Sequence, residues 1–91
     1  MNTLKIYSIH DQKADGFITP FFLGNDELAK RAFIQCVQDP NHQFCKSPSD
    51  FTLFQLGEFE IESANISMNP SPLTLGNGVI YTSLKPDHPQ E

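Results

Sequence analysis

The chain has no tryptophan, only two cysteines and no long apolar run, and these shortages exclude several classes of protein. Two cysteines in 91 residues are too few for the disulfide framework of a small secreted domain. No run of about 18 apolar residues is present, and the N-terminal segment lacks an apolar run of signal-peptide length. We therefore expect a protein of a reducing cytoplasm that makes no membrane contact.

Basic side chains are also scarce, and they are unevenly distributed. Six Lys and Arg stand against eleven Asp and Glu, which gives a net charge of −5. In residues 51–91, Lys85 is the single basic side chain against five acidic ones. An acidic protein repels phosphate at long range, so binding to nucleic acid would need a local basic patch supplied by the first half of the chain.

Sequence motifs for catalysis or cofactor binding are absent as well. The chain has no Walker loop, no glycine-rich dinucleotide turn and no nucleophile elbow. Asp39-x-x-His42-x-x-Cys45 could offer metal ligands, but metal sites usually take four, so a surface loop with an inward cysteine is the simpler interpretation. A Cys36–Cys45 disulfide is sterically possible, although a reducing compartment disfavours it. We expect no enzyme activity, no metal and no cofactor.

The apolar residues that are present predict strands separated by turns. Leu4–His10 alternates loosely between apolar and polar residues, and Phe51–Phe59 is aromatic, β-prone and bounded by turn residues. Phe17–Leu23 contains Pro20, so it fits an edge strand or an extended connection.

One amphipathic helix is expected from Asp26 to Gln38. Asn25 can cap its N-terminus, and Asp39-Pro40 ends it. The loop that follows is expected to tuck Phe44 inward as an anchor. The apolar face of the helix is assigned to Leu28, Ala32, Phe33, Cys36 and Val37.

The second half of the chain is expected to contain short, interrupted strands. The chain can turn at Glu60–Ala64 into a hairpin strand at Asn65–Met68, and Asn69–Pro72 should break that strand. Beyond the break, Leu73–Leu75 and Val79–Ser83 are expected to form a final short strand or hairpin.

These elements predict an α+β fold, in which one amphipathic helix packs across a small antiparallel or mixed sheet of three to five strands. Residues 1–84 would form one compact domain and residues 85–91 a frayed polar tail. A sheet of this size leaves edges and one face without cover, so we expect a homo-oligomer, most simply a dimer.

Five short segments occur in the order and spacing of a known family. They are Lys5–Asp11 with Lys13-Ala14, Pro20-Phe21-Phe22, Arg31-Ala32-Phe33, Asp39–Lys46 and Pro48–Glu60. In these residues the chain resembles the small non-structural protein of gokushoviruses, the icosahedral single-stranded DNA phages of the Microviridae. The family often has an acidic-Thr-Gly turn after its Gly-Glu-Phe strand, where this chain has Glu60–Ala64 without glycine.

The resemblance implies a non-structural bacteriophage protein, made in the cytoplasm of the infected bacterial host and absent from the virion. It implies a role in viral DNA replication, at the shift to single-strand synthesis and DNA packaging, by binding single-stranded DNA. In adjacent Phe21 and Phe22, either one ring is exposed for stacking or both rings are buried. The residues expected to contact phosphate or stack on bases are Lys5, Tyr7, Lys13, Phe21, Lys30, Arg31 and Lys46.

An acidic protein–protein adaptor is the alternative function. Such a protein would dock on the phage replication initiator or a host replication factor through its acidic second half. Basic residues gathered on one folded face would favour DNA. Scattered basic residues beside a large exposed apolar patch would favour a protein partner.

Overall fold

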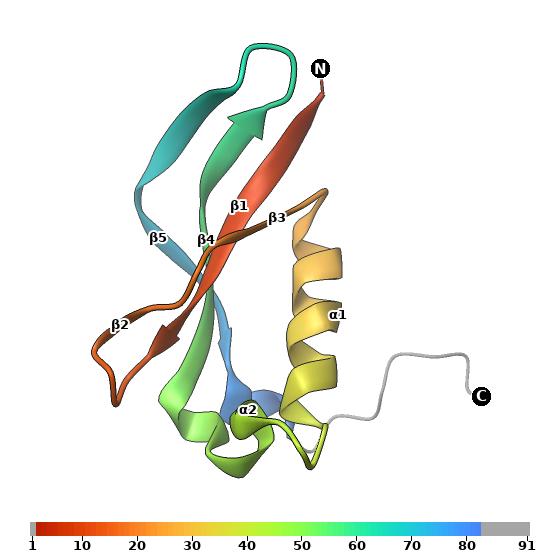
Figure 1. The fold of residues 1–91 in the computed structure, drawn as a ribbon, viewed down its shortest axis with the longest axis vertical. Helices are drawn as coiled ribbons and strands as arrows, with labels where there is room; N and C mark the ends of the chain where they lie inside the picture. The colour runs from red at the N-terminus through yellow and green to blue at the C-terminus, as the bar shows by residue number, and fades with distance from the viewer. Residues whose placement is uncertain (1, 83–91) are drawn as a thin grey trace, which may run out of the picture.

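A computed structural model describes residues 2–82, in which helix α1 packs across one face of an antiparallel sheet (Figure 1). This arrangement confirms the predicted α+β class. The elements are β1 (Thr3–Asp11), β2 (Gly16–Phe17), β3 (Phe21–Leu23), α1 (Asp26–Val37), α2 (Gln43–Lys46), the 3₁₀ turn η1 (Pro48–Asp50), β4 (Phe51–Glu60), β5 (Asn65–Asn77) and α3 (Gly78–Tyr81).

The sheet has the order β2-β1-β4-β5, and β3 also pairs with β1. All of these pairings are antiparallel. The predicted edge segment Phe17–Leu23 is confirmed as two short strands on the outer side of β1, separated by Ile18–Pro20. In the centre, Ile6 lies opposite Gly57 and Tyr7 opposite Gln55, so Leu56 is an extra residue that forms a bulge in β4.

Helix α1 begins where the sequence predicts. The Asn25 side chain accepts a hydrogen bond from the Leu28 amide at 2.9 Å. The buried stripe of the helix, however, is Ala29, Phe33 and Val37, an i, i+4, i+8 series. Leu28 and Ala32, which were expected on the apolar face, are exposed, because the buried stripe is centred on Phe33 and includes Ala29 instead.

Aromatic packing forms the core between α1 and the sheet. The Phe33 ring lies 5.7 Å from the Phe44 ring and 5.9 Å from that of Tyr81, measured between centroids. The inward position of Phe44 is confirmed, although its segment forms α2 and η1 rather than an irregular loop. The remaining core residues are Tyr7, Ile9, Phe51 and Leu53 of the sheet with the buried stripe of α1.

The predicted strand break at Asn69–Pro72 is wrong, because β5 runs through it. Met68 lies opposite Gly57 and Leu73 opposite Gln55, so these four residues bulge from the ladder without ending the strand. Asn69 Nδ2 donates to the Gln55 carbonyl at 3.2 Å and to Gln55 Oε1 at 3.1 Å, which ties the bulge to β4. Proline is tolerated because β5 is an edge strand.

The hairpin at Glu60–Ala64 is confirmed, and Leu73–Leu75 is a strand, as the last part of β5. The second expected segment, Val79–Ser83, forms no strand in its described part, residues 79–82. Asn77 instead caps α3, and its side chain accepts from the Val79 amide at 2.9 Å. Tyr81 then turns back into the core and donates to the Leu75 carbonyl at 2.8 Å. The tail expected at residues 85–91 lies outside the described residues.

Candidate functional site

The sheet has two faces, and α1 covers only one of them (Figure 1). Because side chains alternate along a strand and cross-strand partners share a face, the neighbours of buried Tyr7, Ile9 and Leu53 point away from the helix. We call this side the open face. The register assigns to it Leu4, Ile6, Ser8, His10, Phe17, Phe22, Thr52, Phe54, Phe59, Ile66, Met68 and Thr74. The bulged Leu56 has no cross-strand partner, and we assign it to the same face because it follows Gln55 of the helix side.

Aromatic rings are packed edge to face along the open face. The Phe17 ring contacts the rings of His10 and Phe54, with centroids 5.0 and 5.5 Å apart. The Phe22 and Phe59 rings form a second pair at 5.5 Å. Contacts of this kind hold each ring in one orientation, so the open face is a largely preformed surface.

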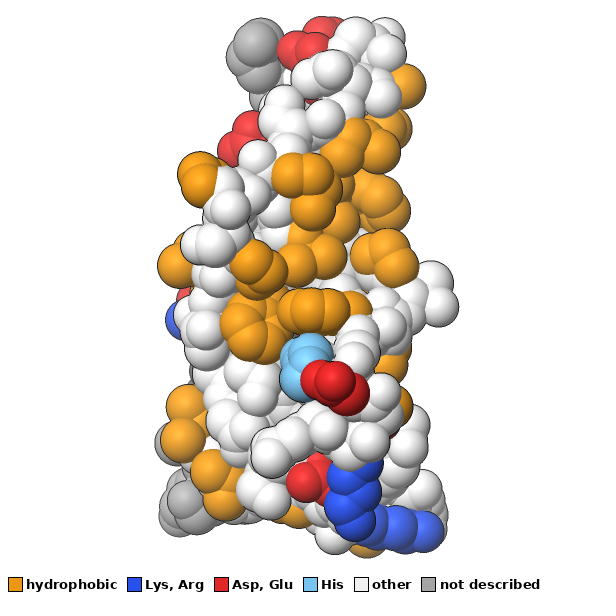
Figure 2. Space-filling view, turned by 90° about the vertical axis from the view of Figure 1, so that its left-hand side faces the viewer, with side chains coloured by type: hydrophobic (Ala, Val, Ile, Leu, Met, Phe, Trp, Pro, Cys, Tyr) orange, Lys and Arg blue, Asp and Glu red, His pale blue; other side chains and the backbone are white. Residues whose placement is uncertain are grey.

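The apolar part of the open face is large for a protein of this size. Four of its side chains stand well exposed, namely Phe17 (47%), Phe22 (40%), Ile66 (54%) and Met68 (62%). At about 200 Å² for each free side chain, their exposed parts add up to roughly 400 Å². Figure 2 shows the face as a nearly continuous band of hydrophobic side chains. Patches of about 300–600 Å² are the largest on typical monomers and often mark an interaction site.

The open face contains no charged side chain among its assigned residues. None of the thirteen residues assigned to it above is Asp, Glu, Lys or Arg. In Figure 2 the red and blue side chains lie mostly above, below or beside the hydrophobic band. Any contact made by these side chains would therefore be apolar rather than ionic.

The basic residues predicted to contact phosphate are spread over several elements. Lys5 in β1 lies on the helix side of the sheet, and its Nζ is 2.6 Å from Glu58 Oε2. Lys13 is exposed in the turn between β1 and β2, with Nζ 3.9 Å from Asp50 Oδ2. The other three are Lys30 and Arg31 on α1 and Lys46 at the end of α2.

The prediction that Tyr7 stacks on bases is wrong in this fold, because the Tyr7 side chain is fully buried. Its hydroxyl donates to Asp26 Oδ1 at 2.8 Å, and Gln55 Nε2 donates to the same oxygen at 2.7 Å. Burial, and then the hydrogen bond to Asp26 and its charge, raises the pKa of Tyr7 far above its usual range. Tyr7 anchors the helix N-terminus to the sheet.

Of the two adjacent rings, the structure exposes Phe22 rather than Phe21, which was the ring expected to stack on bases. Phe22 is exposed on the open face, whereas Phe21 is half-buried and stacks on the Tyr7 ring at 5.8 Å. Phe17 and Met68 were not predicted as site residues. Alternation alone gives two sets of side chains per strand, and it does not say which set the helix covers.

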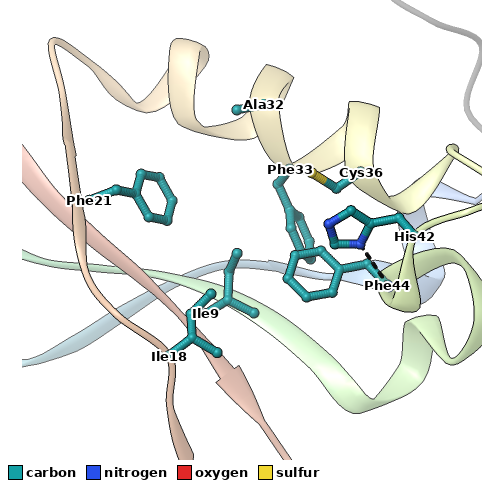
Figure 3. A pocket seen from close by; sticks show the side chains of 8 residues that line it. All are labelled: Ile9, Ile18, Phe21, Ala32, Phe33, Cys36, His42 and Phe44. Atoms are coloured by element: carbon teal, nitrogen blue, oxygen red, sulfur yellow. Dashed lines mark hydrogen bonds between the residues drawn. The ribbon is translucent and has the colours of Figure 1, made fainter.

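A cavity of about 300 Å³ lies beside α1, away from the open face (Figure 3). Phe21 stands at one end of it, with His42 and Phe44 at the other. The Phe44 amide donates to His42 Nδ1 at 3.1 Å, so a neutral His42 ring carries its proton on Nε2. Cys36 also lines the cavity, and burial followed by the charge of Asp39 raises the pKa of its thiol. The lining is otherwise apolar.

Acidic side chains gather at the tip of the β4–β5 hairpin rather than on the open face. Glu58 pairs with Lys5, and Glu60 accepts a hydrogen bond from Ser63 Oγ at 2.5 Å. The strand ends at Glu60, so Glu62 lies in the turn and does not continue one strand face with Glu58 and Glu60.

The remaining candidates from the sequence can be placed within residues 2–82. No group of three or more His, Cys, Asp and Glu that could hold a metal ion occurs there. Asp39 Oδ1 instead accepts from the Asn41 amide at 3.0 Å, and Cys36 and Cys45 are both free thiols. Of the helices in this part of the chain, none is long and apolar enough to cross a membrane.

Fold and surface together define a small α+β protein that presents an uncharged, aromatic sheet face. The chain belongs to the phage ORF5 protein family, whose family model matches residues 4–81. That match confirms a bacteriophage protein; membership of the gokushoviruses or of the Microviridae stays a prediction. A search of curated proteins and a search of solved structures each give no match.

Proposed function

We propose that this phage protein acts without catalysis, by binding a protein partner through the open face, during replication of the viral genome. The observation that carries the proposal is the uncharged band of exposed Phe17, Phe22, Ile66 and Met68, on the sheet face opposite α1. Scattered basic residues beside such a patch are the arrangement that favours a protein partner over DNA.

The charge distribution also favours a protein partner over DNA. Strong binding to a nucleic-acid backbone needs several cations along one groove. Here Lys5 is paired with Glu58, while Lys30 and Arg31 lie on α1, on the other side of the sheet from the exposed rings. The net charge of −5 opposes DNA at longer range as well.

The resemblance of residues 5–60 to the gokushovirus protein supports the replication stage, host cytoplasm and absence from the virion. The phage replication initiator and host replication proteins are accordingly candidate partners. A role limited to replication and packaging predicts that loss of the protein lowers the yield of single-stranded genomes while duplex replicative DNA still accumulates.

Complementation of a phage that lacks this gene tests the proposal. The rescuing copies are wild type, the pair Ile66→Lys with Met68→Lys, and the pair Leu73→Lys with Ile80→Lys. The control side chains are 51% and 55% exposed and lie off the open face, and both pairs change the net charge equally. We expect the open-face pair to lose most of the single-stranded genome yield and the control pair to keep it. Equal yields would refute the role of the open face.

Single-stranded DNA binding is the second candidate, and the exposed Phe17 and Phe22 rings favour it, because bases stack on such platforms. Fluorescence anisotropy with an oligonucleotide at about 50 and about 200 mM salt separates the two functions. The protein-binding account predicts no more than weak DNA binding, unchanged when Lys13, Lys30 and Arg31 are replaced by Gln. Micromolar affinity that falls steeply with salt and with those substitutions would establish the DNA function.

A further inference from the structure

We infer that the partner of the open face is a second copy of this chain, so that two sheets pack face to face in a twofold-symmetric dimer. This inference rests on the proposed function, because it names the protein that covers the same surface. Stacked sheets lie about 10 Å apart with their side chains interdigitated, and a self-complementary patch closes on itself without further growth.

The area of the open face matches what a modest dimer needs. The four well-exposed apolar side chains offer roughly 400 Å², and half-buried Phe54, Leu56 and Phe59 enlarge the patch. Two such patches meeting face to face would bury about 800 Å² of apolar surface, and the polar side chains at the border would add to that area. Specific interfaces bury about 1,200–2,000 Å² in total, so the apolar patch alone supplies most of the area at the lower end of that range.

The lack of charged side chains on the open face favours a second copy over a charged partner protein. A basic partner would find no carboxylate among the open-face residues, and an acidic partner would find no cation. Two copies of net charge −5 repel each other at long range. The open faces can still meet, because none of the residues assigned to them is Asp or Glu. An uncharged apolar surface is best covered by another of the same kind.

The sheet edges are poor places for self-association, which leaves the face. β5 is the outer strand on one side, and Pro70 and Pro72 in its bulge lack the N–H groups that edge pairing needs. On the other side, the edge of β1 is already occupied by β2 and β3, which are two and three residues long. Strands this short present few free backbone N–H and C=O groups with which another chain could pair.

Analytical ultracentrifugation of the full chain from about 1 to about 500 μM tests the dimer. We expect a concentration-dependent monomer–dimer equilibrium. The pair Ile66→Lys with Met68→Lys should raise the dissociation constant at least tenfold, while Leu73→Lys with Ile80→Lys changes it less than twofold. Circular dichroism and thermal unfolding of all three proteins establish that each is folded.

Two outcomes overturn the inference. A monomer over the whole range, or a dimer that the open-face pair leaves intact, shows that a second copy does not cover this face. The complementation result then separates the two claims. If the open-face pair still abolishes rescue, the face binds a different protein and the proposed function stands. If that pair rescues like wild type, both proposals fail.

Discussion

Ala64 closes the β4–β5 hairpin with a backbone φ of 63°, in the left-handed region that favours glycine. A Cβ atom at this φ destabilises the folded state by about 1–2 kcal/mol. Glycine would remove that strain, but it would also raise the entropy of the unfolded chain, which offsets part of the gain. We therefore expect Ala64→Gly to stabilise the protein by about 0.5–1 kcal/mol in urea unfolding. Ala14→Gly, in the β1–β2 turn at a position without positive φ, is the control and should give no gain. If the two substitutions changed the free energy of unfolding equally, the inference of backbone strain at Ala64 would be wrong.

Tyr7 couples stability to alkaline pH. Its raised pKa means that the folded state keeps the hydroxyl proton while the unfolded state releases it at about pH 10. Its contribution to stability is thus complete below pH 10 and declines as the pH rises further. We expect Tyr7→Phe to lower the free energy of unfolding by about 1–2 kcal/mol at pH 8, through loss of the bond to Asp26.

The same variant should show a shallower decline in stability than wild type between about pH 9.5 and 11, because it lacks the titrating hydroxyl. Chemical unfolding at a series of pH values measures both effects. Parallel curves for the two proteins would show that Tyr7 titrates alike in the folded and unfolded states.

Among the elements, β4 and β5 lie in close backbone contact at Gly57. A Cβ atom at this position would lie 2.9 Å from Met68 Cα and overlap the Ser67 carbonyl oxygen, both of them backbone atoms. We expect Gly57→Ala to destabilise the fold by about 2 kcal/mol, because the two strands must move apart. Gly16→Ala is the matched control, since its Cβ would meet nothing within 4 Å. Thermal unfolding compares the stabilities of the two variants. If Gly57→Ala were as stable as Gly16→Ala, the close approach of β4 and β5 at Gly57 would be refuted.

Local signals made α1 and β4 predictable from the sequence. The cap at Asn25 and the stop at Asp39-Pro40 act through neighbouring residues, so both ends of the helix were found within one residue. The path of residues 69–82 was not predictable in the same way. The bulge at Asn69 depends on Gln55 of another strand, and α3 is fixed by Tyr81 packing in the core.

The candidate site was predicted less well than the fold, because it depends on which strand face the helix covers. Alternation places Tyr7 and Ile6 on opposite faces, and only the position of α1 makes Tyr7 the core residue. The Leu56 bulge shifts the register within β4, and it brings the Phe59 side chain beside Phe22. Neither the position of α1 nor the Leu56 bulge can be recognised from the residue pattern of a single strand.

For the whole molecule, net charge and apolar surface act in opposite directions on association. Two copies of net charge −5 repel each other, and salt screens that repulsion while it leaves the apolar contacts in place. We expect the dimer to tighten two- to fivefold between about 50 and about 500 mM sodium chloride, measured by sedimentation equilibrium. Contacts made by ion pairs would weaken with salt instead, as would binding to DNA.

Site-specific photo-crosslinking in infected cells tests most directly whether the open face binds protein. A photoreactive phenylalanine analogue replaces Met68 on the open face in one strain and Leu73, on the other side of β5, in a second. The account predicts that irradiation at Met68 gives a protein adduct, of twice the mass of the chain if a second copy is bound, and that Leu73 gives none. A DNA adduct at Met68, or the same products from both positions, would contradict it.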